Sequence, residues 1–178
     1  MSEDAIVLVA YDPGWPAAYI LARQEIVSLL PTSPLLVEHV GSTAVPGLMS
    51  KPVIDIIVLV ADMAPARAAI PSLARIGYEF RPGVSNPTRL FFRRYGTDGV
   101  RTHHLHIHTD CEDVQRHVLF RDRLRSDAAT RRDYEALKHD LARRHPSNRE
   151  AYAKGKDDFI DAVVRAAGGP ERRPFWKA

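Results

Sequence analysis

The pattern of apolar and polar positions divides the chain near residue 110. Before that point, short runs rich in Val, Ile and Phe are separated by Gly and Pro, which is typical of strands joined by turns. The runs predict strands at 5–10, 35–40, 52–60, 77–81, 89–95 and 102–108. Apolar residues at helical spacing predict helices at 15–30 and 64–76, the second with Pro71 in its first turn or at a kink.

After Cys111 the strand patterns stop and three amphipathic helices are predicted. The first covers about 112–126, and the second covers about 127–145 and ends before Pro146. The third begins with Ser147 as its N-cap, because Glu150 three residues later completes a capping-box pattern, and it ends at Gly168–Gly169.

The order of these elements predicts an α/β (α+β) fold, in which a mixed β-sheet with flanking helices is followed by a C-terminal helical segment. We expect one domain over residues 1–168, with a sheet core at 1–110 and a helical part at 111–168 that packs on it. Residues 169–178 form a tail in which Phe175 and Trp176 indicate docking on another surface.

Composition indicates a globular protein in a reducing compartment. The 178 residues are 45% hydrophobic and 26% charged, and a single cysteine excludes an internal disulfide. The first residues are acidic where a signal peptide is basic, and their apolar run is too short to span a membrane. We therefore expect a soluble, cytoplasmic protein with no membrane partner.

Charge is spread unevenly along the chain. Residues 1–60 hold two basic and six acidic residues, a net charge of −4, so the remainder carries +7 of the total of +3. A basic second half could favour an anionic ligand such as a nucleotide. Solvated helical faces explain the same distribution equally well.

A carboxylate stands in the middle of the apolar strand KPVIDIIVLV. Burying Asp55 is costly unless another group pairs with it. One interpretation is that Asp55 is an acid of a metal or nucleotide site. The other is that it accepts backbone N–H bonds and so anchors the preceding turn.

That turn, GSTAVPG, offers groups suited to an anion. Gly41 allows a tight turn, and Ser42 and Thr43 add hydroxyls to backbone N–H groups that could form an anion nest. The spacing of a P-loop is absent, although Lys51 follows nearby and could pair with Asp55 or a phosphate. An ordinary Gly/Ser turn remains the alternative.

Histidines recur at alternate positions of THHLHIH. Alternation puts His104, His106 and His108 on one face, where His104 and His106 could join Asp55 in binding a divalent ion. Imidazole ligands favour Zn, Mn, Fe or Ni over Mg. The alternative is a polar strand that faces solvent.

Several cations could bind phosphate. Arg89 and Arg93 share one face of a strand, and Arg121 lies on a predicted helix; arginine forks suit phosphate groups. Lys138 and Lys156 could line the junction between sheet and helices. Each also fits a solvated surface residue or a charge that protects an edge strand.

Several long motifs resemble the GrpB family, which also occurs fused to dephospho-CoA kinase. They cover roughly residues 5–167 and are EHVGSTAVPGLMSKPVIDIIV, HHLHI, LFRDRLR, YEALKHDLA and YAKGKDDFI. The resemblance implies a fold of the nucleotidyltransferase superfamily. Enzymes of that superfamily place a Gly-Ser turn before a strand with two alternate acids that hold metal ions.

The superfamily pattern is matched only in part. Gly41 and Ser42 match the turn and Asp55 matches one acid, so Ser42 and Asp55 are the implied catalytic residues. The alternate positions Val53 and Ile57 are apolar, so the usual acid pair is missing. Glu38 could replace the second acid if its side chain points inward.

Two functions therefore stay open. The chain could be a metal-dependent nucleotidyltransferase that uses an NTP and Mg, Mn or Zn. It could instead be a degenerate module that binds a nucleotide or CoA-related molecule and assists a dephospho-CoA kinase. The partner is a small molecule or nucleotide in both cases; a pI near 9.2 without a recognised binding module does not favour nucleic acid. The sequence indicates no oligomeric state.

Overall fold

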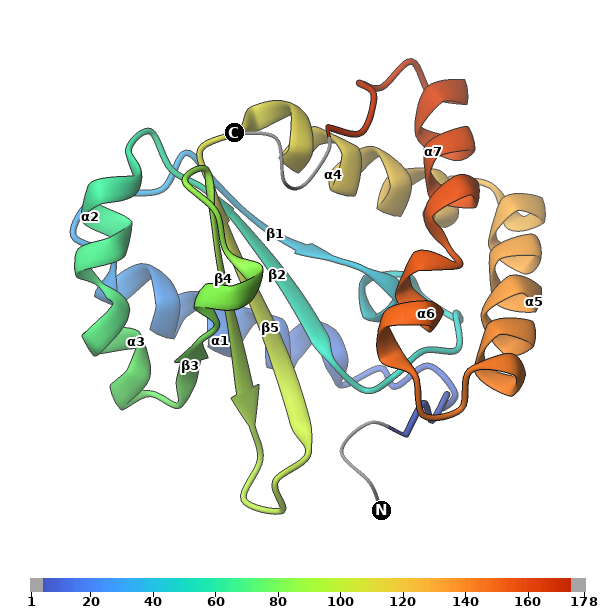
Figure 1. The fold of residues 1–178 in the computed structure, drawn as a ribbon, viewed down its shortest axis with the longest axis horizontal. Helices are drawn as coiled ribbons and strands as arrows, with labels where there is room; N and C mark the ends of the chain where they lie inside the picture. The colour runs from blue at the N-terminus through green and yellow to red at the C-terminus, as the bar shows by residue number, and fades with distance from the viewer. Residues whose placement is uncertain (1–4, 174–178) are drawn as a thin grey trace.

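A five-stranded mixed sheet forms the centre of the computed structural model, which describes residues 5–173 (Figure 1). β2 and β5 are parallel, and every other neighbouring pair is antiparallel, as the mixed α/β prediction requires. The strands lie in the order β1 (Leu36–Val40), β2 (Ile54–Leu59), β5 (Arg101–His108), β4 (Arg89–Tyr95) and β3 (Tyr78–Phe80).

Helices cover both faces of the sheet. In Figure 1, α2 and α3 lie at the left of the sheet and α5, α6 and α7 at the right. The helices are α1 (Trp15–Leu29), α2 (Met63–Ala68), α3 (Ile70–Arg75), α4 (Cys111–Ser126), α5 (Ala128–Arg144), α6 (Arg149–Lys154) and α7 (Asp157–Ala166). Short 3-10 turns, η1 (Ser42–Ala44) and η2 (Pro82–Val84), follow β1 and β3.

The main core lies between one sheet face and the first three helices. Alternate strand residues such as Ile56 and Leu105 point to this side and are fully buried against Ile26 of α1 and Leu73 of α3. Because side chains alternate across a strand, the residues between them point to the other face. There Ile57 and Val40 pack under Val114 of α4.

A second core ties the helical half to the turn after β1. Val45 and Leu48 are fully buried among aromatic and aliphatic side chains of α4, α5 and α7, including Phe120, Tyr134 and Val164. The rings of Phe120 and Tyr134 meet edge to face at 5.0 Å. This packing fixes the helices over the loop between β1 and β2.

Three sequence predictions about elements need correction. Within the described residues, segment 5–10 forms one isolated bridge, between Val9 and Ser50, and no regular strand. The third C-terminal helix has Asn148, whose side chain accepts the N–H of Ala151, as its N-cap in place of Ser147. It also breaks into α6 and α7 at Gly155, where Leu141 lies 2.4 Å from the place of an added Cβ.

Other boundaries agree with the sequence. The predicted helix at 64–76 is interrupted between α2 and α3, with Pro71 in the first turn of α3. The last helix is followed by Gly168 with φ of 72°. Phe175 and Trp176, which indicated tail docking, lie outside the described residues. Among the helices of residues 5–173, none combines the length and apolar character that crossing a lipid bilayer requires.

Candidate functional site

The sheet face opposite the main core is called the polar face below. Two rows of side chains cross it from β1 to β4. Directly paired residues share a face, so the strand register places Val40, Asp55, His104 and Arg93 in one row. The next row contains Glu38, Ile57, His106 and Phe91. The predicted histidine face is therefore the face that carries Asp55.

Asp55, His104 and His106 form a compact cluster on this face. Nδ1 of His104 donates a hydrogen bond of 2.9 Å to Oδ1 of Asp55. One ligand atom from each of the three residues can be chosen so that all lie within 4.8 Å of one another. The side chains of Asp55 and His104 keep 30% and 16% of their exposure, so solvent reaches the cluster.

The electrostatics of the cluster favour metal binding. Burial opposes ionisation of Asp55, but the hydrogen bond and charge of His104, with Lys51 and Lys156, hold the pKa of this carboxyl below its ordinary value. Burial holds the pKa of His106 well below 6.5, so its ring is neutral near pH 7 and keeps a lone pair.

This donor set fits a divalent ion. Nε2 of His104 is buried without a hydrogen-bond partner, and a carboxylate beside two imidazoles suits Zn or Mn better than Mg. Asp55, His104 and His106 would hold such an ion. They form the one group of three His, Cys, Asp or Glu side chains with this spacing in residues 5–173.

The Gly-Ser turn lies directly against Asp55. Gly41 has φ of 70° and ψ of −172°, and a Cβ added there would lie 2.3 Å from Oδ2 of Asp55. Only glycine adopts this backbone region readily and leaves room for the carboxylate. Ser42 follows at the start of η1, where its side chain lies near the buried hydroxyl of Tyr134.

Thr43 holds the turn together from inside. Its hydroxyl donates to the carbonyl oxygen of Val53 at 3.1 Å, which leaves the oxygen to accept from Nε2 of His39 at 3.0 Å. Thr43 is 1% exposed and His39 is 6% exposed. The hydroxyl of Thr43 is therefore engaged within the fold, and phosphate binding by Thr43 stays a prediction that concerns its backbone N–H.

Two lysines lie close to one aromatic ring. Nζ of Lys51 is 5.2 Å and Nζ of Lys156 is 4.7 Å from the ring centre of Tyr152. Burial, with Lys156 nearby, lowers the pKa of Lys51 to about 8, and burial also lowers the pKa of Lys156. Both lysines feel the charge of Asp55.

Neither lysine forms an ion pair with another described residue. Half-buried cations that share one carboxylate and form no ion pair favour an anionic ligand. The sequence predicts Lys51 as a site residue and Lys156 only as one of several helical cations. Tyr152 lies in α6, and Lys156 caps the start of α7 after the break at Gly155. The helix predicted over both residues therefore does not place Lys156 beside Lys51.

Arg121 and Glu38 pair with each other. Nη1 of Arg121 donates to Glu38 at 2.6 Å and to the carbonyl oxygen of His39 at 2.8 Å. These bonds tie α4 to β1. Glu38 is therefore committed to an ion pair, and Val53 and Ile57 are buried apolar residues, so one carboxylate serves the cluster.

A further histidine, which the sequence does not single out, lies next to the histidines of β5. His117 of α4 lies with its ring centre 6.2 Å from His106 and 6.4 Å from His108. Nδ1 of His108 faces the carboxylate of Asp113 at 3.2 Å. No local sequence signal places His117 here, since its position depends on how α4 docks.

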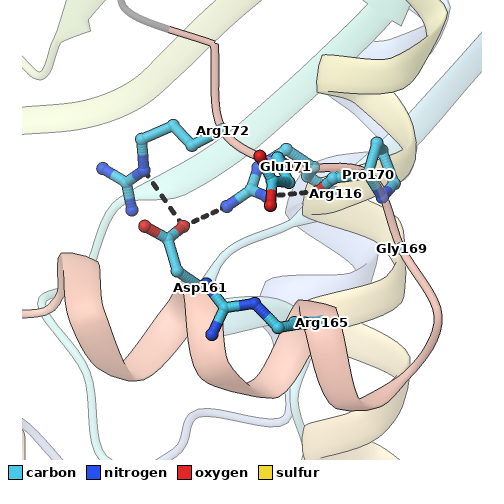
Figure 2. Close-up of a pocket in the computed structure, with 7 residues that line it drawn as sticks. All are labelled: Arg116, Asp161, Arg165, Gly169, Pro170, Glu171 and Arg172. Atoms are coloured by element: carbon cyan, nitrogen blue, oxygen red, sulfur yellow. Dashed lines mark hydrogen bonds and ion pairs between the residues drawn. The ribbon is translucent and has the colours of Figure 1, made fainter.

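A separate hollow of about 170 Å³ lies beside α7 (Figure 2). In it, Arg116 of α4 bonds Asp161 of α7 and the carbonyl oxygen of Pro170, and Arg172 bonds Asp161 at 3.1 Å. These ion pairs hold residues 170–173 against the two helices. The hollow shares no residue with the Asp55 cluster.

Comparison with known sequences identifies the family. The model of the family described as GrpB protein matches residues 5–166. A UPF0157 protein of Pseudomonas aeruginosa is 38% identical over 97% of this chain and 72% of its own length. A dephospho-CoA kinase of Mycolicibacterium paratuberculosis is 34% identical over 96% of this chain, which spans 48% of that enzyme.

Comparison of structures agrees. The conserved protein GrpB from Enterococcus faecalis is similar with a TM-score of 0.81 and 34% identity, over 90% of this chain and 96% of that one. The Cid1 poly(U) polymerase is similar in fold, with a TM-score of 0.56 and 15% identity over 77% of this chain and 44% of that one. The sheet and helices thus have a nucleotidyltransferase-like arrangement, and the chain belongs to the GrpB family.

Proposed function

We propose that the protein is a metal-dependent nucleotidyltransferase. The observation that carries this proposal is the contact between Gly41 and Asp55, which joins a Gly-Ser turn to an Asp/His/His cluster. Such a turn offers backbone N–H groups to phosphate, and the cluster offers ligands to a divalent ion. The unit that acts comprises residues 1–168, because the helical part packs on the same turn.

In the proposed reaction, an oxygen of the acceptor attacks the α-phosphorus of an NTP. A new P–O bond forms, and the bond from the α-phosphorus to the oxygen that bridges to the β-phosphate breaks. Pyrophosphate leaves with that electron pair, and the acceptor's proton passes to solvent. A divalent ion held by Asp55, His104 and His106 supplies neutralisation of phosphate charge when bound.

The remaining site residues position the triphosphate. Backbone N–H groups of Gly41 and Ser42 bind phosphate oxygens at the turn. Lys51 and Lys156 place two positive charges beside the same carboxylate, where an incoming phosphate chain compensates them. Tyr152 holds the two ammonium groups near its ring.

A second candidate is a binding module without turnover. The observation that favours it is the burial of Val53 and Ile57, at 6% and 0% exposure, where the superfamily pattern has a second acid. Such a module would bind a nucleotide or CoA-related molecule. The match to about half the length of a dephospho-CoA kinase supports an accessory role.

The test is a thermal-shift screen with NTPs and CoA-type molecules, with and without Mg²⁺, Mn²⁺ and Zn²⁺. Wild type is compared with Asp55→Asn and His106→Ala. Asp158→Asn and His139→Ala are matched controls, since both residues are exposed on helices away from the cluster. We expect an NTP to raise the melting temperature of wild type and both controls only with metal, and neither cluster variant to respond.

Pyrophosphate release then separates the two candidates. Release from an NTP with metal, lost in Asp55→Asn, supports the transferase. Metal-dependent binding without release under any acceptor supports the module. If no nucleotide or CoA-type molecule shifts wild type and Asp55→Asn merely melts earlier, Asp55 is a structural anchor and both candidates fail.

A further inference from the structure

Arg93 of β4 lies in the same row of the sheet as Asp55 and His104, next to His104. It is paired directly with His104 across the β4–β5 ladder, and adjacent strands are roughly 4.8 Å apart. Its guanidinium lies over the ring of Phe91, 5.7 Å from the ring centre. The Phe91 ring in turn contacts His104 and His106, with ring centres 5.3 and 4.8 Å away.

This guanidinium has no anionic partner among residues 5–173. The Nε of Arg93 is buried and makes no hydrogen bond, and the Arg93 side chain forms no ion pair with a described residue. The carboxylate at the paired position of β3, Glu79, is bonded to Arg81 at 2.6 Å. By contrast, the next residue along β4, Arg94, bonds Glu25 at 2.8 Å on the opposite face.

An unpartnered cation beside a site for a metal cation raises a physical problem. The guanidinium of Arg93 and a metal ion bound at the cluster would repel each other. The buried Nε–H of Arg93, which has no hydrogen-bond partner, also costs free energy. An anion bound between Arg93 and the metal site would remove the repulsion and satisfy the Nε–H. An arginine fork binds two oxygens of a phosphate, and the third oxygen then faces the metal ligands. Arg93 is therefore suited to an anion that arrives with a ligand.

The position of Arg93 separates it from the triphosphate groups. Gly41 and Ser42 follow β1, whereas Arg93 is on β4, three strand spacings or roughly 14 Å across the sheet. Lys51 and Lys156 interact with Asp55, on the β2 side of His104. The Asp/His/His cluster thus has Lys51 and Lys156 near Asp55 and Arg93 beside His104.

We infer that Arg93, supported by Phe91, is the anion subsite for the second substrate, and that the acceptor of the nucleotidyl group is a small phosphorylated molecule. This inference rests on the proposed function. The phosphate of the acceptor binds Arg93, and its nucleophilic group reaches toward the cluster. One arginine recognises a single phosphate group rather than the repeated phosphates of a nucleic acid.

The test uses inorganic phosphate as the probe in calorimetric titrations of the full chain with Mn²⁺ and a saturating non-hydrolysable NTP analogue. Arg93→Gln removes the charge, and Arg93→Lys keeps the charge without the fork. Arg94→Gln is the matched control on the opposite face. We expect wild type and Arg94→Gln to bind phosphate, Arg93→Lys to bind at least threefold more weakly, and Arg93→Gln at least tenfold more weakly.

Binding of the NTP analogue is measured on the same variants. The inference predicts that its dissociation constant changes less than twofold in Arg93→Gln. An equal loss of analogue and phosphate binding would assign Arg93 to the triphosphate and overturn the inference. So would unchanged phosphate binding in Arg93→Gln, no phosphate binding by wild type, or binding of a 5′-phosphorylated oligonucleotide in preference to phosphate.

Failure of the proposed function gives a different result. In that case wild type binds no NTP analogue, and phosphate alone is titrated. Loss of phosphate binding in Arg93→Gln would then still establish the anion subsite, while its role toward an acceptor would fall with the transferase.

Discussion

The two faces of the sheet use the same strands for opposite purposes. On the face toward α1, α2 and α3, successive inward residues such as Ile56, Leu105 and Phe92 are completely buried and apolar. On the other face, their immediate neighbours Asp55, His104 and His106 are polar and partly accessible. One face of each central strand thus contributes side chains to the main core, and the other face contributes side chains to the candidate site.

The difference shows where the fold tolerates unfavourable groups. Burying a leucine side chain contributes about 1.5–3 kcal/mol of stabilisation, whereas burying imidazoles and lysines without full pairing costs free energy. The polar face keeps such groups because the apolar face supplies stability. Four tests probe this division, from the largest expected effect to the smallest.

Neighbouring residues of β5 give the most direct test. Leu105→Ala leaves a cavity in the main core and should lower the free energy of unfolding by about 2–5 kcal/mol. His106→Ala, one position along, should lower it by about 1 kcal/mol and abolish the metal-dependent shift. Urea denaturation of both variants measures the difference. A loss from His106→Ala as large as that from Leu105→Ala would show that the polar face is also a core.

Gly41→Ala tests how the site constrains the backbone. The alanine would have to adopt φ near 70° with ψ near −172°, and its Cβ would collide with the Asp55 carboxylate. We expect a loss of about 1–3 kcal/mol. Gly83→Ala is the control, because Gly83 has ordinary φ and no atom within 4 Å of an added Cβ. Equal stability of the two variants would contradict the close contact with Asp55.

Local patterns were enough to predict most of this architecture. Alternation in THHLHIH assigned His104 and His106 to one face, and the strands and helices around them were mostly found, since both periods are properties of short segments. One wrong prediction involves a distant contact, since the predicted third helix breaks at Gly155, against which Leu141 packs. Another is a local choice between adjacent residues, in which Asn148 rather than Ser147 caps the helix.

The site shows the same limit. Sequence could name Asp55, His104 and His106 as candidates, but only the strand register makes Asp55 and His104 neighbours. Lys156 and His117 reach the site from helices, and their docking is not a local property of the sequence. The family resemblance predicts the nucleotidyltransferase-like fold and singles out the Gly41–Ser42 turn, which periodicity alone does not.

The pH dependence of stability tests the buried histidine beneath the turn. Burial lowers the pKa of His39 to about 4 from 6.5, so between these values the unfolded chain binds a proton that the folded chain does not. Stability attributable to His39 is complete above pH 6.5 and falls as pH drops toward 4. Between pH 6.5 and 5.5, wild type should lose about 1 kcal/mol more than His39→Gln. Parallel pH profiles in urea titrations would show that His39 is protonated in the fold.

The smallest effect is expected from the ion pairs that hold residues 170–173 over the helices covering the polar face. Arg172 is 37% exposed and pairs with Asp157 at 2.6 Å and Asp161 at 3.1 Å. Exposed pairs contribute little because water and salt screen them, so Arg172→Ala should lower the free energy of unfolding by about 0.5 kcal/mol, and by less in 1 M NaCl. Arg165→Ala, in the same hollow, is the control for loss of a surface arginine. A loss above about 2 kcal/mol that persists in salt would mean that the helical cover, and with it the polar face, depends on this segment for stability.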